Sequence, residues 1–307
     1  MIKDRSRNRT LNCDPTGWRR ALILCFAICC ATCAPLFGQN GADSFGTSSA
    51  VHFASSIDWE KGEITIELSR SLPESGRNLP AAGFAAEVAM KQALPDEIGR
   101  ALLPLQVDSL HSVADLVQST PELYRTFQSL SPEVQEGFPV YSSDLRTITI
   151  PYTLPLYPAV ASLLVHHSQP SPLDTTLQWV PTNKFTGVVI YARGKLPLHG
   201  TGQTADLVPS LFPTLYDTSM RQIVGKLRMD PSYLKRWGAA AYTTGFSETP
   251  YIGRIGLSPL RIVATEFFGE TPTDIIISDK DANALLSTDN NRSLLVEGRI
   301  LIIYGHN

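Results

Sequence analysis

The sequence has no cysteine beyond Cys33, because all five of its cysteines lie near the start of its 307 residues. No disulfide can therefore stabilise the rest of the chain, and an apolar core has to do so. Long apolar runs are also scarce. The run from Ala21 to Ala34 is shorter than the about 20 residues that a membrane-spanning helix needs, and Pro35 follows it.

The first 38 residues are predicted to be a signal peptide. Basic residues precede the apolar run and small residues follow it, which is the order found in secretory leaders. The expected cleavage falls after Gly38 and leaves Gln39 at the new terminus. A lipoprotein signal at Cys33 is the alternative, although Cys30 stands where such signals usually carry a leucine-like residue. Acidic residues before the run leave open a start codon downstream of Met1.

The exported part also lacks a basic excess. Residues 1–38 contain six of the 26 basic and two of the 29 acidic side chains, so 20 basic and 27 acidic side chains remain, with a net charge of −7. Such a chain is poorly suited to neutralise phosphates, which argues against nucleic acid and against charge-driven binding to anionic lipid. Membrane contact is expected only if Cys33 is lipidated. About 270 residues suffice for one or two domains.

The sequence predicts an α+β fold that begins with a hairpin and a helical stretch. Residues 39–50 are small and polar and are expected to form a flexible lead-in. Apolar alternation from Val51 to Leu68 predicts two strands joined by a turn at Lys61–Gly62. Small residues at helical spacing predict a closely packed helix over 81–103, which Pro95 should kink or restart.

The remainder of the region 51–180 is predicted to contain short helices and one strand. Helices are expected over 109–118, from Thr120–Pro121 and from Ser131–Pro132, where a capping side chain precedes proline. The alternation over 145–154 predicts a half-buried strand. Its Pro151 indicates a sheet edge or a bulge, because proline cannot donate to a ladder.

Residues 185–304 are predicted to form a mixed sheet with flanking helices. The short apolar run 187–192 is typical of a strand that is buried on both faces. Asp230–Pro231 predicts a helix N-terminus. Three further strands are expected over 255–268, 274–277 and 294–304, with a helix over 278–287 that Ser278 or Asp279 caps.

Four motifs of this half carry a resemblance to a known family. They are Phe185–Gly194, Pro213–Asp217 with Arg221 and Val224–Gly225, Gly256–Ala264, and Thr273–Ala282, in that order. Over residues 185–303 the chain resembles exported, often lipid-anchored envelope proteins of the FlgP type, relatives of the flagellar assembly protein FlgT. The resemblance implies a compact α/β domain without known catalysis in outer-envelope or flagellum-associated assemblies. It implies envelope or flagellar partners, in the periplasm or at the periplasmic face of the outer membrane.

Four charged residues are candidates for interaction or structural roles: Arg193, Asp217, Arg221 and Asp274. Arg193 directly follows a buried strand and needs an acid, water or a ligand to compensate its charge, with Asp206 or Asp217 as candidate acids. Asp217 and Arg221 flank a short connection and are expected to pair across it.

No metal, cofactor or catalytic site is predicted. Asp274, Asp279 and Asp281 resemble a divalent-cation set, but the last two fit the first turn of a helix. The main hypothesis is a non-enzymatic exported protein that binds other proteins, including copies of itself through exposed strand edges. The alternative is a small-ligand binder or hydrolase with a pocket near Arg193 and His199.

Overall fold

A computed structural model describes residues 50–73, 78–175 and 182–306, and Ser48–Asn307 fall in one compact unit. The leader, its cleavage point at Gly38 and Gln39, the alternative at Cys33 and nearly all of the lead-in lie outside the described residues. The secondary structure is α+β, as predicted.

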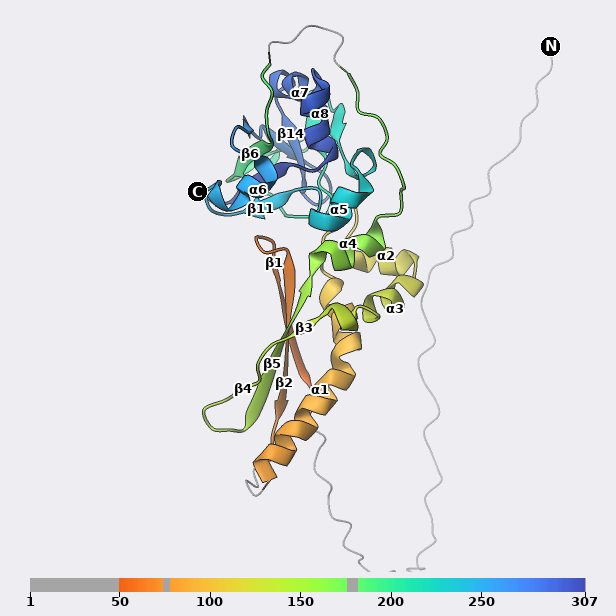
Figure 1. Cartoon of the computed structure of the whole chain (residues 1–307), viewed down its shortest axis with the longest axis vertical. Coiled ribbons are helices and arrows are strands. Elements are labelled where there is room, and N and C mark those ends of the chain that lie inside the picture. The colour runs from red at the N-terminus through yellow and green to blue at the C-terminus, as the bar shows by residue number, and fades with distance from the viewer. Residues whose placement is uncertain (1–49, 74–77, 176–181, 307) are drawn as a thin grey trace, which may run out of the picture. The chain divides into compact units, whose positions relative to one another are not determined.

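The elements of the first half are β1 (His52–Asp58), β2 (Glu63–Ser71), α1 (Leu79–Leu102), α2 (Val113–Ser119), α3 (Glu122–Gln128), η2 (Ser131–Glu133), β3 (Gln135–Glu136), β4 (Val140–Tyr141), β5 (Thr147–Pro155), η3 (Leu156–Val160) and α4 (Ala161–Leu164). Those of the second half are β6 (Val188–Arg193), β7 (Leu196–Leu198), β8 (Gln203–Ala205), β9 (Leu215–Asp217), β10 (Gln222–Val224), η4 (Lys226–Arg228), α5 (Pro231–Trp237), β11 (Ala241–Thr243), η5 (Thr249–Tyr251), α6 (Ile252–Ile255), β12 (Leu260–Val263), β13 (Glu266–Phe268), β14 (Asp274–Ile277), α7 (Asp279–Leu286), α8 (Asp289–Val296) and β15 (Ile300–Gly305). Figure 1 labels most of them.

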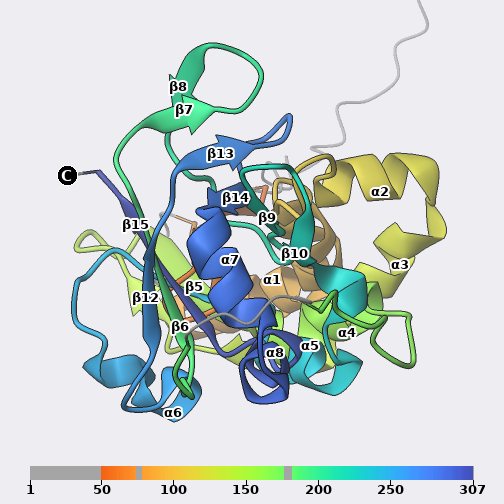
Figure 2. The same cartoon turned by 90° about the horizontal axis from the view of Figure 1, so that it is seen from above.

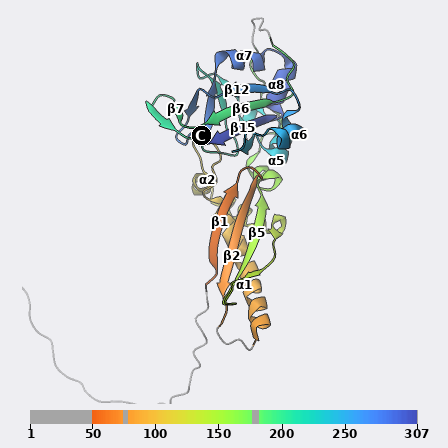
Figure 3. The ribbon, with the colours of Figure 1, turned by 90° about the vertical axis from the view of Figure 1, so that its left-hand side faces the viewer.

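An antiparallel sheet in the order β1-β2-β5-β3 organises the first half, and β4 pairs with β5 as well. The predicted hairpin is confirmed, with Gly62 in the left-handed region of its turn (φ 69°). Alternate residues of β2 and β5, such as Ile66 and Ile150, are fully buried. Helix α1 packs on that face of the sheet (Figure 3), and Val113 of α2 and Phe127 of α3 belong to the same core.

Helix α1 differs from the prediction in two ways. It continues through Pro95 instead of restarting there. Its buried face includes Met90, Leu94 and Ile98, whereas Ala85 of the predicted small-residue face is exposed. A proline inside a helix costs about 3 kcal/mol, and each large apolar side chain that is buried contributes about 1.5–3 kcal/mol, so burial outweighs the missing donor.

Pro151 lies in a central strand, so the predicted edge position is wrong. Strand β5 pairs with β2 on one side and with β3 and β4 on the other. The partner strand is interrupted opposite Pro151, where Gly137 N–H donates to the Pro151 carbonyl at 2.8 Å. The missing proline donor therefore falls at a break between two short strands, which is the bulge-like irregularity that the proline also indicated.

The second half contains two sheets instead of one mixed sheet. One has the order β10-β9-β14-β13-β7-β8, and the other has the order β11-β15-β6-β12. The second sheet is parallel throughout. Figure 2 labels three of its strands, β6, β12 and β15. As predicted, β6 is buried on both faces: Ile190 joins the main core, whereas Val189 packs in a smaller cluster with Ile255 of α6.

Two predicted strands of this half turn out to be composite. The segment 255–268 begins with the last residue of α6, which is followed by Gly256 (φ 68°). Strands β12 and β13 come next and belong to different sheets. The segment 294–304 contains the end of α8 and then β15, with Gly298 (φ 63°) between them. Left-handed glycines end both helices, which apolar content alone does not reveal. Asp230 caps α5 as predicted, and of the two candidate caps of α7, Ser278 and Asp279, it is Ser278 that caps the helix.

Candidate functional site

Asp274, a residue singled out from the sequence, lines a cleft of about 440 Å³. Three separate segments bring the main groups together. The loop before α2 contributes Asp108, the segment around β9 contributes Phe212 and Tyr216, and η4 contributes Lys226.

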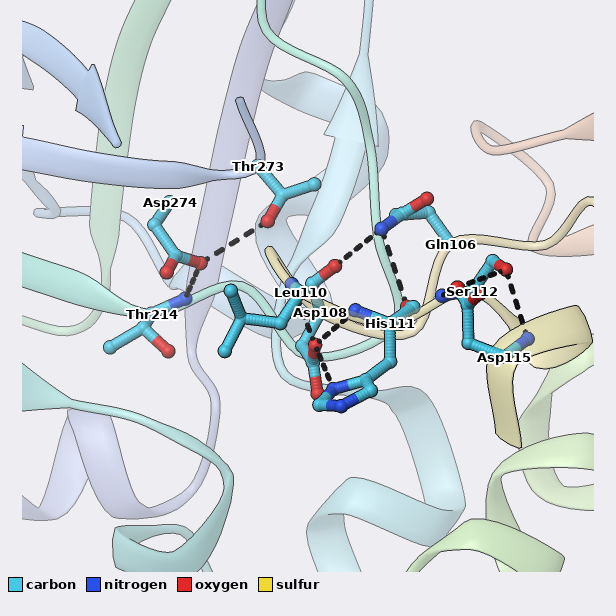
Figure 4. Close-up of polar contacts among 9 residues, drawn as sticks. All are labelled: Gln106, Asp108, Leu110, His111, Ser112, Asp115, Thr214, Thr273 and Asp274. Carbon is cyan, nitrogen blue, oxygen red and sulfur yellow. Dashed lines mark hydrogen bonds and ion pairs between the residues drawn. The ribbon is translucent and has the colours of Figure 1, made fainter. Parts of the chain in front are cut away.

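The Asp274 carboxyl is nearly inaccessible, since only 2% of the residue is exposed. Its Oδ1 accepts hydrogen bonds from Thr214 N at 3.0 Å and from Thr273 Oγ1 at 3.2 Å (Figure 4). Burial raises the pKa of Asp274, and these hydrogen bonds offset part of the rise. A carboxyl in this environment holds a proton to a higher pH than an exposed aspartate does.

The Asp108 loop is held rigidly by its own side chains (Figure 4). Asp108 Oδ1 accepts from Leu110 N at 2.9 Å and from His111 N at 2.8 Å, and Gln106 Nε2 donates to Asp108 O at 2.6 Å. A capping box between Ser112 and Asp115 then starts α2. The Asp108 carboxylate therefore organises the loop that forms one wall of the cleft.

The same loop is fixed against the second half of the chain. Phe212 N donates to Val107 O at 2.9 Å, and Thr271 N donates to Ser109 O at 3.0 Å. Gly269 has φ 116°, and a Cβ there would stand 2.4 Å from Ser109 Cβ. The cleft wall is thus anchored by backbone contacts at several points.

Lys226 is a cation of the cleft that has no ion-pair partner among the described residues. Its Nζ lies 4.6 Å from the centre of the Phe212 ring. Burial lowers the pKa of Lys226, and the negative charge of Asp108 offsets part of that effect. Tyr216 adds a hydroxyl whose pKa is raised, chiefly by burial and further by Asp274. Asp274 was a candidate from the sequence, whereas Lys226, Phe212 and Asp108 were not, because no local motif links segments so far apart.

Asp217 and Arg221 form the predicted pair across the β9–β10 turn. Arg221 Nε donates to Asp217 Oδ2 at 2.8 Å, and Asp217 Oδ1 accepts from the backbone N–H groups of Ser219 and Arg221. Arg221 also reaches Asn283 Oδ1 of α7 at 3.2 Å. Asp217 is 3% exposed, so these two residues hold a turn and present no free carboxylate.

Arg193 does not pair with either of its candidate acids. Its Nη1 donates to Thr244 O at 2.7 Å, its Nη2 donates to the backbone carbonyl of His306, and Phe246 lies 4.4 Å from its guanidinium. Backbone carbonyls and an aromatic ring compensate the charge instead, which sequence reasoning could not foresee.

His199 Nδ1 lies 2.7 Å from Glu266 Oε2. Neither Arg193 nor His199 lines the Asp274 cleft, and neither lines a second cleft at Trp59. The pocket expected near Arg193 and His199 therefore coincides with neither of these two clefts.

The second cleft, about 310 Å³, contains a buried cation with a structural role. Arg254 donates to the carbonyls of Trp237, Gly238 and Gly298, each at 2.7 Å. These carbonyls lie at the C-terminal ends of α5 and α8, where a positive charge is favourable. Burial lowers the pKa of Arg254 to about 10.

A different surface combines an open sheet edge with exposed apolar side chains. Phe138 is 90% exposed and Val140 is 60% exposed, at the interruption between β3 and β4 and on β4 itself. Tyr141 lies over α1, where a Cβ at Gly83 would stand 2.7 Å from its hydroxyl, and the neighbouring Phe84 is 68% exposed. We call Phe138–Tyr141 the apolar edge.

Two of the aspartates that resembled a divalent-cation set are engaged by protein groups. Asp279 Oδ1 accepts from Thr218 N at 3.1 Å, and Asp281 forms the cap of α7 with Ser278. Across residues 50–73, 78–175 and 182–306, no group of three or more His, Asp or Glu side chains is arranged to hold a metal ion. In the same part of the chain, no helix has the length and apolar character to cross a membrane.

Two domain families match the chain in succession. Residues 50–163 match the model described as the N-terminal domain of Treponema pallidum Tp0624. Residues 187–306 match the model described as the second domain of the same protein. The chain is similar to Tp0624. Among curated proteins, none matches it.

The similarity to Tp0624 corrects the family suggested by the four sequence motifs. The second-domain match covers the segment that was read as FlgP-like or FlgT-like, so that resemblance was wrong. The reason lies in the motifs themselves. Their apolar runs are β6, β9, β12 and β14, and such runs suit buried strands of many folds.

Proposed function

We propose that this protein is a non-enzymatic assembly protein that pairs with another protein chain through its apolar edge. The observation that carries the proposal is the exposure of Phe138 and Val140 on a side of the sheet that no described strand pairs. Natural edge strands are usually guarded by charges, covers or prolines, and contiguous exposed apolar residues mark interaction sites. Here Pro139 is the guard, and residues 137–143 carry no charge.

The occupant we propose is a second copy of the chain. A two-fold axis beside β4 pairs the strand with its own equivalent in the antiparallel direction that the sheet already uses. Identical residues then stand close to each other across the axis. Because the apolar edge is uncharged, that pairing brings no like charges together, and it buries Phe138 and Val140.

Two of the expectations drawn from the sequence do not depend on the apolar edge. Export rests on the leader predicted in residues 1–38. A flagellar or envelope partner is not part of the proposal, because its basis was the resemblance that the Tp0624 domain matches contradict.

Sedimentation velocity of the full-length chain over a range of concentrations tests the proposal. We expect reversible dimerisation, and we expect Val140→Lys to weaken it at least about tenfold, because two charges then face each other across the axis. The matched control is Val263→Lys on β12, an exposed valine of a different sheet. A wild-type chain that stays monomeric at about 1 mM, or equal effects of the two substitutions, would contradict the proposal.

A further inference from the structure

The Asp274 cleft contains a cation for which the described chain provides no partner. The Lys226 ammonium lies over the Phe212 ring and is partly desolvated. Within the described residues it forms neither a hydrogen bond nor an ion pair. Asp108 attracts it only through space, since Asp108 Oδ1 is engaged by the amides of its own loop. A partly buried ammonium in this state is stabilised by any anion that reaches it.

The neighbouring cation is already engaged. Arg228 Nη1 donates to Gln222 O at 2.9 Å and lies 3.3 Å from Asp174 Oδ2. Lys226 is therefore the group that an incoming anion meets. A single ammonium forms a point-charge contact, which suits a monoanion. The carboxyl groups of Asp108 and Asp274 in the same wall disfavour a doubly charged phosphate.

The cleft also offers apolar contact. Leu110 and Leu227 line it and are 63% and 61% exposed, and the Phe212 ring is buried beneath Lys226. Two exposed leucines beside a buried aromatic ring favour a ligand with an apolar body.

We propose that this cleft binds a small organic carboxylate with an apolar body. The carboxylate pairs with Lys226, and the apolar body lies against Phe212, Leu110 and Leu227. Two sources have this chemistry: a free hydrocarbon acid, and the carboxyl terminus of a peptide that ends in an apolar residue. The inference is independent of strand pairing at the apolar edge, so either can fail without the other.

Isothermal titration calorimetry of the full-length chain tests this inference with two probes and their neutral counterparts. The probes are hexanoate and N-acetyl-L-leucine, and the controls are hexanamide and N-acetyl-L-leucinamide. We expect at least one carboxylate to bind about tenfold or more tightly than its amide. Binding of hexanoate alone indicates a free hydrocarbon acid, whereas binding of N-acetyl-L-leucine alone indicates a peptide terminus; binding of both assigns the shared carboxylate chemistry.

Variants assign the binding to Lys226. Lys226→Met keeps the length of the side chain but removes the charge, and we expect it to abolish the preference for carboxylate over amide. Lys226→Arg should retain the preference, and so should Lys280→Met, which removes an exposed lysine of α7 outside the cleft. Near-ultraviolet circular dichroism identifies any variant that has not folded. Equal binding by Lys226→Met and wild type, or no binding of either probe at about 10 mM, would overturn the inference.

Discussion

Replacing Asp217 decides whether this carboxylate is a structural group or an available interaction site. Its Oδ1 accepts two backbone N–H groups and its Oδ2 accepts Arg221 Nε, all at 2.8–3.0 Å. Asp217→Asn keeps one acceptor oxygen but turns an N–H₂ group towards Arg221. A hydrogen bond between charged groups contributes about 1.5–3 kcal/mol, and the 38% exposure of the Arg221 side chain places the expected loss near the lower end, about 1–2 kcal/mol.

Asp217→Ala should cost more, because it also leaves the N–H groups of Ser219 and Arg221 without their acceptor. Two further neutral hydrogen bonds at about 0.5–1.5 kcal/mol each bring the expected loss to about 2–5 kcal/mol. For a chain of this size, each kcal/mol lowers the melting temperature by about 2–4 °C. Urea unfolding at constant pH measures both variants, and unchanged m-values confirm that the unfolded reference is the same.

A double-mutant cycle with Arg221→Met isolates the pair itself. We expect a coupling free energy of about 1 kcal/mol or more between the two positions. Asp144→Asn is the control, since Asp144 also accepts a turn N–H, from Arg146 at 3.1 Å, but is exposed. A coupling below about 0.3 kcal/mol, with Asp217→Asn as stable as wild type, would refute the structural role and return Asp217 to the candidates for ligand contact.

Two further predictions concern buried positions. Burial raises the pKa of Asp274, so its contribution to stability is complete below the unfolded value near 3.8 and is lost as the pH rises through the folded pKa. Asp274→Asn should therefore become more stable relative to wild type between pH 4 and pH 7, as measured by urea unfolding. A difference that does not change with pH would show that the pKa is not raised. Gly187→Ala places a Cβ 2.5 Å from the Cα and carbonyl oxygen of Ile255 and should lower the free energy of unfolding by about 1–3 kcal/mol or more. The control Gly253→Ala adds a Cβ in open space and should be neutral or stabilising. Equal melting temperatures of the two variants would contradict the close approach before β6.

The parts of the fold that depend on neighbouring residues were predictable from the sequence. The turn at Lys61–Gly62, the N-caps Asp230 and Ser278, and the buried strand β6 each follow from a few adjacent side chains. The pair of Asp217 and Arg221 belongs to the same class, because four positions separate its members.

The predictions that failed concern residues whose environment is formed by segments distant in the sequence. Pro151 has the chemistry of an edge residue, but its partner is two short strands whose break accommodates the missing donor. Arg193 follows a buried strand, yet its partners are carbonyls from residues 244 and 306. Neither the break between β3 and β4 nor the carbonyl partners can be recognised from the nearby sequence, because every residue has a backbone carbonyl.

Lys226 shows why an unpaired group is informative in this chain. Residues 39–307 contain more acidic than basic side chains, so carboxylates are available in excess. Three buried or half-buried cations elsewhere have such compensation: Arg221 by Asp217, Arg299 by Glu297, and Arg254 by the carbonyls of two helix ends. Among the described residues Lys226 has no such partner although it is partly desolvated, and an incoming carboxylate would offset the cost of that desolvation. An uncompensated group in a cleft with apolar walls is the arrangement expected when the partner arrives from outside the chain.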